Sequence, residues 1–172
     1  MDLSQPIDIY CERLDIGMWA EPINAVTNIG FILTSIFMWL RCKNLVEGRI
    51  LSFILFSIGC GSFLHHTFAQ TWAAILDVTA ILIFILTYIF VANRRFLDLS
   101  KVVSVIGVVL FFPYQLLLAS LLSNIQFFGS SVQYIPVAIL IFIYSVLLRK
   151  SEPKLCRGLF IGATILCLSL VF

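Results

Sequence analysis

Charged residues are scarce in this chain of 172 residues, of which only 12% are Asp, Glu, Lys or Arg. Soluble domains carry roughly 25% charged residues, so the deficit argues against a soluble globular protein. Hydrophobic residues make up 61% of the chain and gather in long stretches that hold very few charges. The composition therefore predicts an integral membrane protein.

Other absences narrow the class further. The first twenty residues are polar and lack the short apolar core of a cleavable signal peptide. The five cysteines form no Cys-x-x-Cys pair, and Cys60 and Cys167 fall in apolar stretches, as small apolar fillers do. No soluble domain, internal repeat or low-complexity tract is present, and we expect no nucleic-acid partner. We therefore expect one transmembrane domain over residues 1–172.

Six apolar stretches are long enough to cross about 30 Å of hydrocarbon as helices, at about 1.5 Å per residue. They cover residues 20–40, 50–68, 71–90, 102–122, 131–148 and 155–172. A membrane barrel is excluded, because the stretches are too long for barrel strands and do not alternate strictly. Pro113 and Pro136 lie inside two of the stretches and predict kinks there. The fold class is an all-α, polytopic transmembrane helix bundle.

The basic residues predict which side of the membrane each loop faces. Ten of the eleven Lys and Arg residues follow the first, third and fifth stretches, in alternate loops. The loops near Gln70 and Asn124 have none. Because Lys and Arg are enriched in cytoplasmic loops, we expect the three basic loops to face the cytoplasm and the N-terminus to face outward.

Polar residues of the second and third stretches converge near the predicted outer surface. Ser62 and His66 are four residues apart, so they lie on the same face of a helix. Gly59 and Gly61, just before them, allow a neighbouring helix to approach closely. A tight turn after the second stretch then places Asp77 at a depth similar to that of His66.

The first stretch carries a matching polar stripe. Its polar residues recur at helical spacing and are Glu21, Asn24, Asn28 and Ser35. Structural explanations exist for each feature, since a serine or histidine in a membrane helix often serves helix packing. An Asp costs roughly 3 kcal/mol in a membrane helix and therefore marks a functional candidate. Taken together at one depth, these residues predict a polar site.

Several motifs resemble those of the alkaline ceramidases. This family belongs to the CREST group of seven-helix membrane hydrolases, which also includes the adiponectin-receptor-like proteins. The motifs are Gly61-Ser62, His66-Thr67, Asp77 eleven residues after the histidine, Tyr10-Cys11-Glu12, and Trp19-Ala20-Glu21-Pro22 with Asn24, Thr27 and Asn28. They lie in the family's order in the N-terminal half of the chain, whereas the C-terminal half matches only in hydropathy.

The resemblance implies a zinc-dependent hydrolase that takes ceramide or a related lipid amide from the bilayer and releases a sphingoid base and a fatty acid. It implies that His66 is a zinc ligand. Ser62 would contact the metal-bound water or the developing oxyanion, and Asp77 would orient that water and move its proton. This chemistry suits an amide, because zinc polarises the carbonyl and a carboxylate can carry a proton to the departing amine.

The resemblance also implies a calcium site near the start of the first helix. Glu12 and Glu21 would help to hold the ion, and Asp15 is a weaker candidate. Leu14 stands where relatives similar to the animal enzymes have an Asn, which makes this site less secure than the zinc site. His65 has no clear counterpart and stays unassigned.

The zinc shell is incomplete in this sequence. Catalytic zinc usually keeps three protein ligands and a water, whereas the chain has two histidines. The family takes its other two ligands from a His-x-x-x-His on a seventh helix, and that motif is missing here. Because the sequence stops at Phe172 inside an apolar stretch, we expect a chain shortened at its C-terminus. Such a chain is expected to be inactive unless another chain donates ligands.

Other functions stay open at this point. An adiponectin-receptor-like relative would use the same zinc chemistry on another lipid amide or ester. A non-catalytic binding or structural protein would keep the fold without the activity. A transporter or cofactor carrier would use His65 and His66, although nothing in their spacing supports a haem site.

Overall fold

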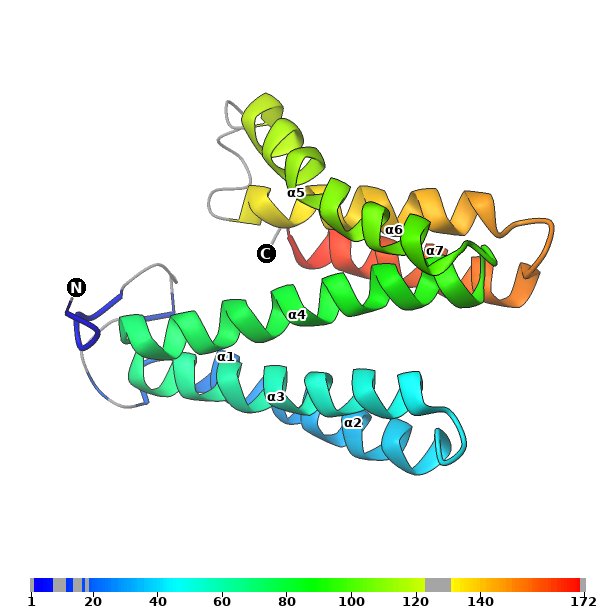
Figure 1. Cartoon of the computed structure of the whole chain (residues 1–172). Helices are drawn as coiled ribbons and strands as arrows, with labels where there is room; N and C mark the ends of the chain where they lie inside the picture. Colours follow the sequence, from blue (N-terminus) through cyan, green and yellow to red (C-terminus); the bar gives the residue numbers. More distant parts are fainter. Residues whose placement is uncertain (1, 8–11, 14–16, 18, 123–130, 171–172) are drawn as a thin grey trace. The chain divides into compact units, whose positions relative to one another are not determined.

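The computed structural model describes residues 2–7, 12–13, 17, 19–122 and 131–170, and within them it contains α-helices and no strand beyond one isolated bridge (Figure 1). The all-α fold class is therefore confirmed. The helices are α1 (Pro22–Thr27), α2 (Ile29–Arg41), α3 (Val46–Phe68), α4 (Thr71–Arg95), α5 (Lys101–Leu122), α6 (Ile135–Leu147) and α7 (Pro153–Ser169).

These helices correspond to the six predicted stretches, with α1 and α2 together forming the first. Four spans of the described chain are long and apolar enough to cross a membrane: Pro22–Arg41, α3, α4 and α5. The segment Ser131–Leu147 is a shorter apolar helix, and α7 has 17 residues. The four spans indicate a multi-pass membrane protein.

The helix ends differ from the predicted ends where polar residues follow the apolar stretch. α3 begins at Val46 rather than at Ile50, and α4 continues to Arg95 rather than to Phe90. A helix does not stop where hydrocarbon stops, because charged side chains are good helix formers in water. Pro136 lies in the first turn of α6, where a proline is tolerated, and Pro113 lies inside α5, so the kinks expected at these positions stay predictions.

The chain divides into two compact units, Met1–Tyr88 and Ile89–Phe172. In the first unit, α1 and α2 both pack against α3. A methyl group added to Gly59 would lie 2.7 Å from the Ile32 side chain and 3.2 Å from Cβ of Phe31, so this glycine allows α2 to approach α3 closely. The predicted role of Gly59 in helix packing is confirmed.

In the second unit, α6 packs against both α5 and α7. Hydrogen bonds join these neighbours. The Tyr114 hydroxyl of α5 donates to the carbonyl of Pro136 at 2.7 Å, and the Ser145 hydroxyl of α6 donates to the carbonyl of Cys156 in α7 at 2.9 Å. Side chains thus bond to the backbone of an adjacent helix, as is common in membrane bundles.

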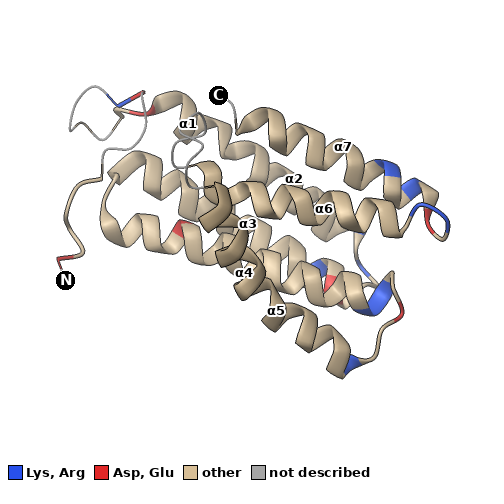
Figure 2. Ribbon diagram, turned by 90° about the horizontal axis from the view of Figure 1, so that it is seen from above, with Lys and Arg blue, Asp and Glu red and all other residues tan. Residues whose placement is uncertain are grey.

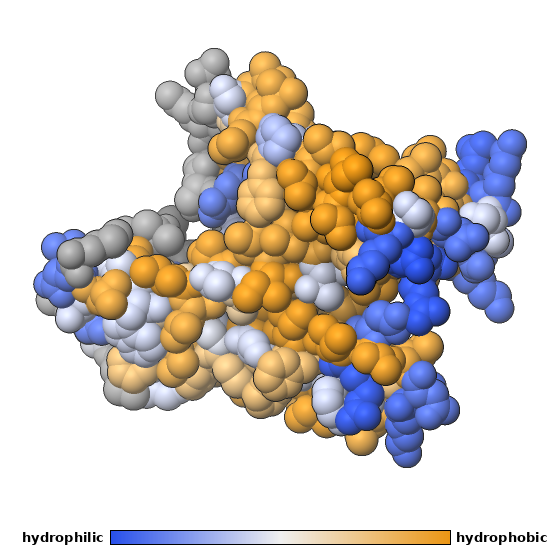
Figure 3. Space-filling view, in the orientation of Figure 1, coloured by the Kyte–Doolittle hydropathy of each residue, from blue (hydrophilic) through white to orange (hydrophobic). Residues whose placement is uncertain are grey.

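Both units expose many apolar side chains (Figure 3), and many of their buried residues are small or polar. Leu116 is 73% exposed and Val102 is 69% exposed, whereas Ser35, Ser52 and Ser104 are buried. Each of these serine hydroxyls donates to a backbone carbonyl three or four residues earlier, at 2.6 to 2.9 Å. Lipid solvates the apolar surface, and the buried hydroxyls are satisfied internally.

Candidate functional site

The α3–α4 hairpin brings the polar residues of its two helices together. α3 ends at Phe68, and Ala69 adopts a left-handed conformation with φ 45° and ψ 49°, so the chain reverses before α4 begins at Thr71. A methyl group added to Gly61 would lie 3.3 Å from both Cα and the backbone nitrogen of Asp77. The predicted tight turn and the close approach at Gly61 are therefore confirmed.

This close approach buries a cluster formed by Ser62, His66 and Asp77, whose exposed fractions are 9%, 8% and 7%. The Ser62 hydroxyl is within hydrogen-bonding reach of the Asp77 carboxylate, and His66 is near enough to interact with it electrostatically. Oδ1 of Asp77 is buried and has no hydrogen-bond partner among the described residues. Because buried polar atoms are nearly always bonded, this oxygen is the atom of the cluster that is open to a proton or a ligand.

Glu21 joins the first helix to this cluster. It precedes Pro22 at the start of α1, and its side chain is 2% exposed. One of its carboxylate oxygens accepts a hydrogen bond from Nε of Arg13 at 2.6 Å, and the other lies 2.6 Å from Nδ1 of His66. Glu21 and His66 were predicted to lie in one layer, and this contact confirms it.

The contact between Glu21 and His66 also orients the imidazole ring. Histidines that bind metals usually donate their second ring N–H to a carboxylate, which fixes both the tautomer and the ring orientation. With Nδ1 directed at Glu21, Nε2 is the nitrogen of His66 that would bind a metal. The carboxylate thus occupies the position expected behind a metal-binding histidine.

Glu12 binds the backbone at the start of α1. Its two carboxylate oxygens accept hydrogen bonds from the backbone nitrogens of Ile23, at 2.6 Å, and Asn24, at 3.0 Å. The first N–H groups of a helix have no partner within the helix, and a negative charge there is stabilising. Glu12 therefore caps α1 from outside the helix. Asn24 takes part in this contact through its backbone nitrogen.

The expected calcium site remains a prediction. Asp15 lies outside the described residues. The carboxylates of Glu12 and Glu21 both accept hydrogen bonds from the protein. A calcium ion at these carboxylates would have to use the lone pairs that these hydrogen bonds leave, or displace Arg13 from Glu21 or the α1 backbone from Glu12.

His65 was left unassigned and lies beside the cluster. Its ring centroid is 5.3 Å from that of His66, with the two rings tilted by 49°, and its side chain is buried. Adjacent residues of a helix point about 100° apart, so the two rings start from different faces of α3. The structure thus places a second imidazole next to the site.

Arg13 was also missed by the sequence analysis, although the charge pattern contained a signal. Ten of the eleven Lys and Arg residues lie in or beside the three connections predicted to face the cytoplasm, and Arg13 is the remaining one. Arg13 is a single cation in an acidic segment, far along the chain from the basic loops. It forms an ion pair with Glu21, which accounts for a cation at this position.

A short N-terminal strap, residues 3–7, crosses the α3–α4 turn. Its carbonyls at Leu3 and Gln5 accept hydrogen bonds from the backbone nitrogens of Trp72 and Thr71, both at 3.1 Å. In return, the nitrogen of Ile7 donates to the carbonyl of Ala69 at 2.7 Å. The strap therefore caps the first free N–H groups of α4 and covers the turn next to the cluster.

The residues fit one part of a zinc site and leave the rest open. His66, oriented by Glu21, and Asp77, with an unbonded buried oxygen, are suitable ligands or partners of zinc. Within the described part of the chain, no group of three or more His, Cys, Asp or Glu residues is arranged to hold a metal ion. The cluster thus supplies fewer than the three protein ligands that catalytic zinc normally has.

Comparison of the chain with protein-family models, with curated proteins and with solved structures gives no match. The function is therefore inferred from the residues of the cluster and from their geometry.

Proposed function

We propose that the cluster at the α3–α4 hairpin is part of a zinc-dependent lipid amidohydrolase site, with ceramide or a related lipid amide as substrate. One observation carries the proposal: His66 contacts a buried carboxylate on one side and lies near Asp77, whose Oδ1 is unbonded. In a purely structural polar cluster, the buried carboxylate oxygen would be hydrogen-bonded within the protein. In a catalytic cluster, that oxygen stays available to accept a proton or to bind a ligand.

The residues take distinct roles in this proposal. Glu21 holds the His66 ring so that Nε2 faces the metal, and Arg13 holds Glu21. Asp77 accepts a proton from the attacking water at Oδ1 and returns it to the departing amine. Ser62 orients the Asp77 carboxylate. When bound, zinc supplies a Lewis acid that polarises the carbonyl and acidifies the water.

The remaining zinc ligands in this proposal come from residues outside the described part of the chain or from another chain, because the described part has no third ligand in place. A lipid amide suits the location. Its tails would stay among the apolar surfaces of the helices, while its head reaches the polar residues near the turn.

We also propose that the strap, the turn and the cluster lie on the non-cytoplasmic side. The α2–α3 and α4–α5 connections carry Lys and Arg, whereas the α3–α4 turn has neither. By the positive-inside rule the basic connections face the cytoplasm. The contact of the strap with the turn supports an N-terminus on that same outer side.

The first test of this proposal measures the zinc content of the protein. This measurement reports metal binding at the site and does not require catalytic turnover. The protein is purified from membranes, and its zinc content is compared for the unchanged chain, His66→Gln and His65→Gln. We expect the zinc that the protein retains to depend on His66 and to be unaffected by the change at His65. Zinc that stays stoichiometric in His66→Gln would contradict the proposal.

A second test measures hydrolysis of a fluorescent ceramide in the membranes that naturally contain the protein. Asp77→Asn should lower the rate by roughly a hundredfold or more, because it removes a general base, while the unfolding midpoint stays close to that of the unchanged protein. The purified 172-residue chain should be inactive alone. Full activity of the isolated chain would show that no outside ligands are needed.

A non-catalytic membrane protein is the second candidate, and the Arg13–Glu21–His66 chain of contacts favours it. These contacts join α1 to α3 and would stabilise the first unit without any metal. In that case Asp77→Asn would leave ceramide turnover in the membranes unchanged. The two functions are thus separated by the same variant.

A further inference from the structure

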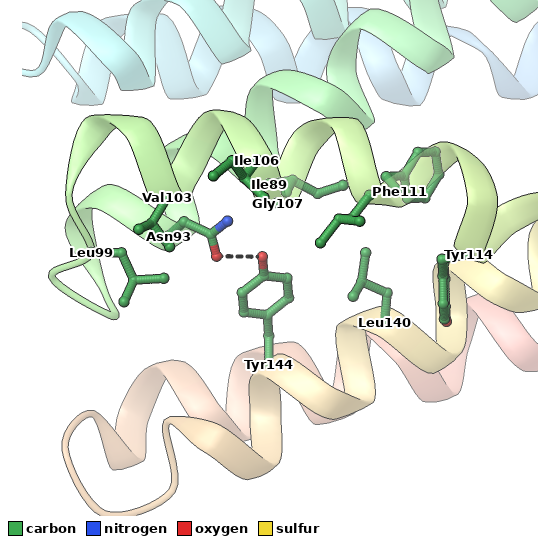
Figure 4. Close-up of a pocket in the computed structure, with 11 residues that line it drawn as sticks. Ile89, Asn93, Leu99, Val103, Ile106, Gly107, Phe111, Tyr114, Leu140 and Tyr144 are labelled. Carbon is green, nitrogen blue, oxygen red and sulfur yellow. Dashed lines mark hydrogen bonds between the residues drawn. The ribbon is translucent and has the colours of Figure 1, made fainter.

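The second unit contains an apolar groove of about 380 Å³, formed by the end of α4, by α5 and by α6 (Figure 4). Its walls include Leu99, Val103, Leu110 and Leu140. Tyr144 rises from α6 towards Asn93 of α4, and its hydroxyl donates a hydrogen bond to Oδ1 of Asn93 at 2.7 Å. Since these two groups bond each other, the groove mainly offers hydrocarbon contacts to an occupant.

The α5 wall of the groove is open to the surroundings of the protein. Ile106 and Leu110 line the groove and are 49% and 58% exposed, and α5 is long and apolar enough to cross a membrane. Lipid therefore reaches the groove directly. The hydrocarbon walls of the groove and the exposed face of α5 therefore favour an acyl chain of a membrane lipid as the occupant.

Lys and Arg residues gather at the α4–α5 connection (Figure 2), and Leu99 of this connection lines the groove. Arg94 directly follows Asn93, and its Nη1 donates to the backbone carbonyl of Leu99, a residue that lines the groove. Lys101 opens α5, two residues before Val103. Both cations are exposed.

The charge balance at this end is positive. The α4–α5 connection carries Arg94, Arg95 and Lys101 against the single acid Asp98. The α6–α7 connection, at the C-terminal end of α6 and thus at the end that holds Tyr144, adds Arg149 and Lys150 together with the acid Glu152, so the balance stays positive. Negatively charged lipids are enriched in the cytoplasmic leaflet, and basic pockets between membrane helices bind their head groups.

We propose that this groove binds one acyl chain of an anionic phospholipid whose net negative head group lies against Arg94 and Lys101. The site is separate from the proposed hydrolase site, because Asp77 lies in the second turn of α4 and Asn93 in its last turn. The bound lipid would stabilise the packing of α5 against α6, which hold opposite walls of the groove. This proposal does not depend on the hydrolase assignment.

Lipid binding is tested by native mass spectrometry of the protein in detergent. The probes are phosphatidylserine and phosphatidylcholine with identical acyl chains, titrated separately. We expect phosphatidylserine to bind more tightly. The double variant Arg94→Gln/Lys101→Gln should weaken phosphatidylserine binding by roughly 30-fold, from about 1 kcal/mol for each cation. It should weaken phosphatidylcholine binding much less, because the choline group offsets the phosphate charge of that lipid.

Groove variants test the acyl-chain part of the site. Leu110→Trp fills the groove and should abolish binding of both lipids. Val109→Trp is the matched control, because Val109 is 59% exposed and does not line the groove. If Leu110→Trp fails to fold, as judged by circular dichroism, Ile106→Phe replaces it with the same expected loss.

Several results would overturn the proposal. Equal affinity for the two lipids would remove the role of Arg94 and Lys101. The same would follow if Lys154→Gln/Arg157→Gln, a charge-matched control in α7, weakened phosphatidylserine binding just as strongly. Phosphatidylserine binding that survives Leu110→Trp, or a spectrum in which a second protein chain rather than lipid is retained, would show that the groove does not hold an acyl chain.

Discussion

The two units of this protein bury different kinds of polar groups. The first unit buries ionisable side chains, namely Glu21, His65, His66 and Asp77. In the described part of the second unit, the buried polar residues are neutral: Asn93, Ser104, Tyr144 and Ser145. Neutral groups can hold membrane helices together at little cost, whereas buried ionisable groups are expensive and usually serve a function. The comparison therefore supports placing the proposed hydrolase site in the first unit and the proposed lipid site in the second.

The largest effect is expected for Glu21→Gln, which removes the charge shared by Arg13 and His66. Breaking a buried ion pair from one side typically destabilises a protein by about 3 kcal/mol or more. The free energy of unfolding in detergent measures this loss. Glu152→Gln is the matched control in the second unit, because Glu152 is exposed and should change stability by less than about 0.5 kcal/mol. Similar losses for both variants would remove the distinction between the units.

A smaller effect is expected for Gly61→Ala. The new methyl group would lie 3.3 Å from the Asp77 backbone, which cannot move as a side chain can. We expect a loss of about 1 to 2 kcal/mol, because the two helices must separate. Gly30→Ala in α2 is the control, since nothing lies within 4 Å of its added methyl group. Alanine favours helix, so this control should be neutral or slightly more stable, and equal losses at both glycines would contradict the close contact.

The smallest effect is expected for Tyr144→Phe in the second unit. It removes one neutral hydrogen bond to Asn93, for which membrane proteins give about 0.6 kcal/mol on average. A double-mutant cycle with Asn93→Ala measures the coupling between the two side chains. A coupling as large as the loss in Glu21→Gln would show that the second unit relies on polar interactions as much as the first does.

The helices could be predicted from the sequence because lipid imposes a simple rule on them. A chain crossing hydrocarbon must satisfy its backbone internally, so each long apolar stretch becomes a helix. The ends were less predictable, as α4 shows by continuing through Arg94 and Arg95 into the aqueous region. Pro136 was read as an interruption, although it lies in the first turn of α6. The hydropathy of the sequence indicates which residues contact lipid, but it says little about the residue at which a helix ends.

The site could be predicted in part, and there is a physical reason why some of its residues could be placed and others could not. Ser62, His66 and Asp77 belong to one hairpin, so helical spacing and a short turn sufficed to place them together. The contacts of Glu12 and Glu21 join segments far apart in the sequence, and no local pattern reveals them. Glu12 was assigned to calcium by resemblance, whereas in the structure it caps α1.

The N-terminal strap has a consequence for how the protein is made. Its carbonyls at Leu3 and Gln5 bond to Trp72 and Thr71, which are synthesised some seventy residues later. The strap therefore cannot dock until the α3–α4 turn has left the ribosome. Until then, the first segment must wait on the side of the membrane where the turn will emerge. Docking of the strap would thus report that the first three spans have been inserted in the correct direction.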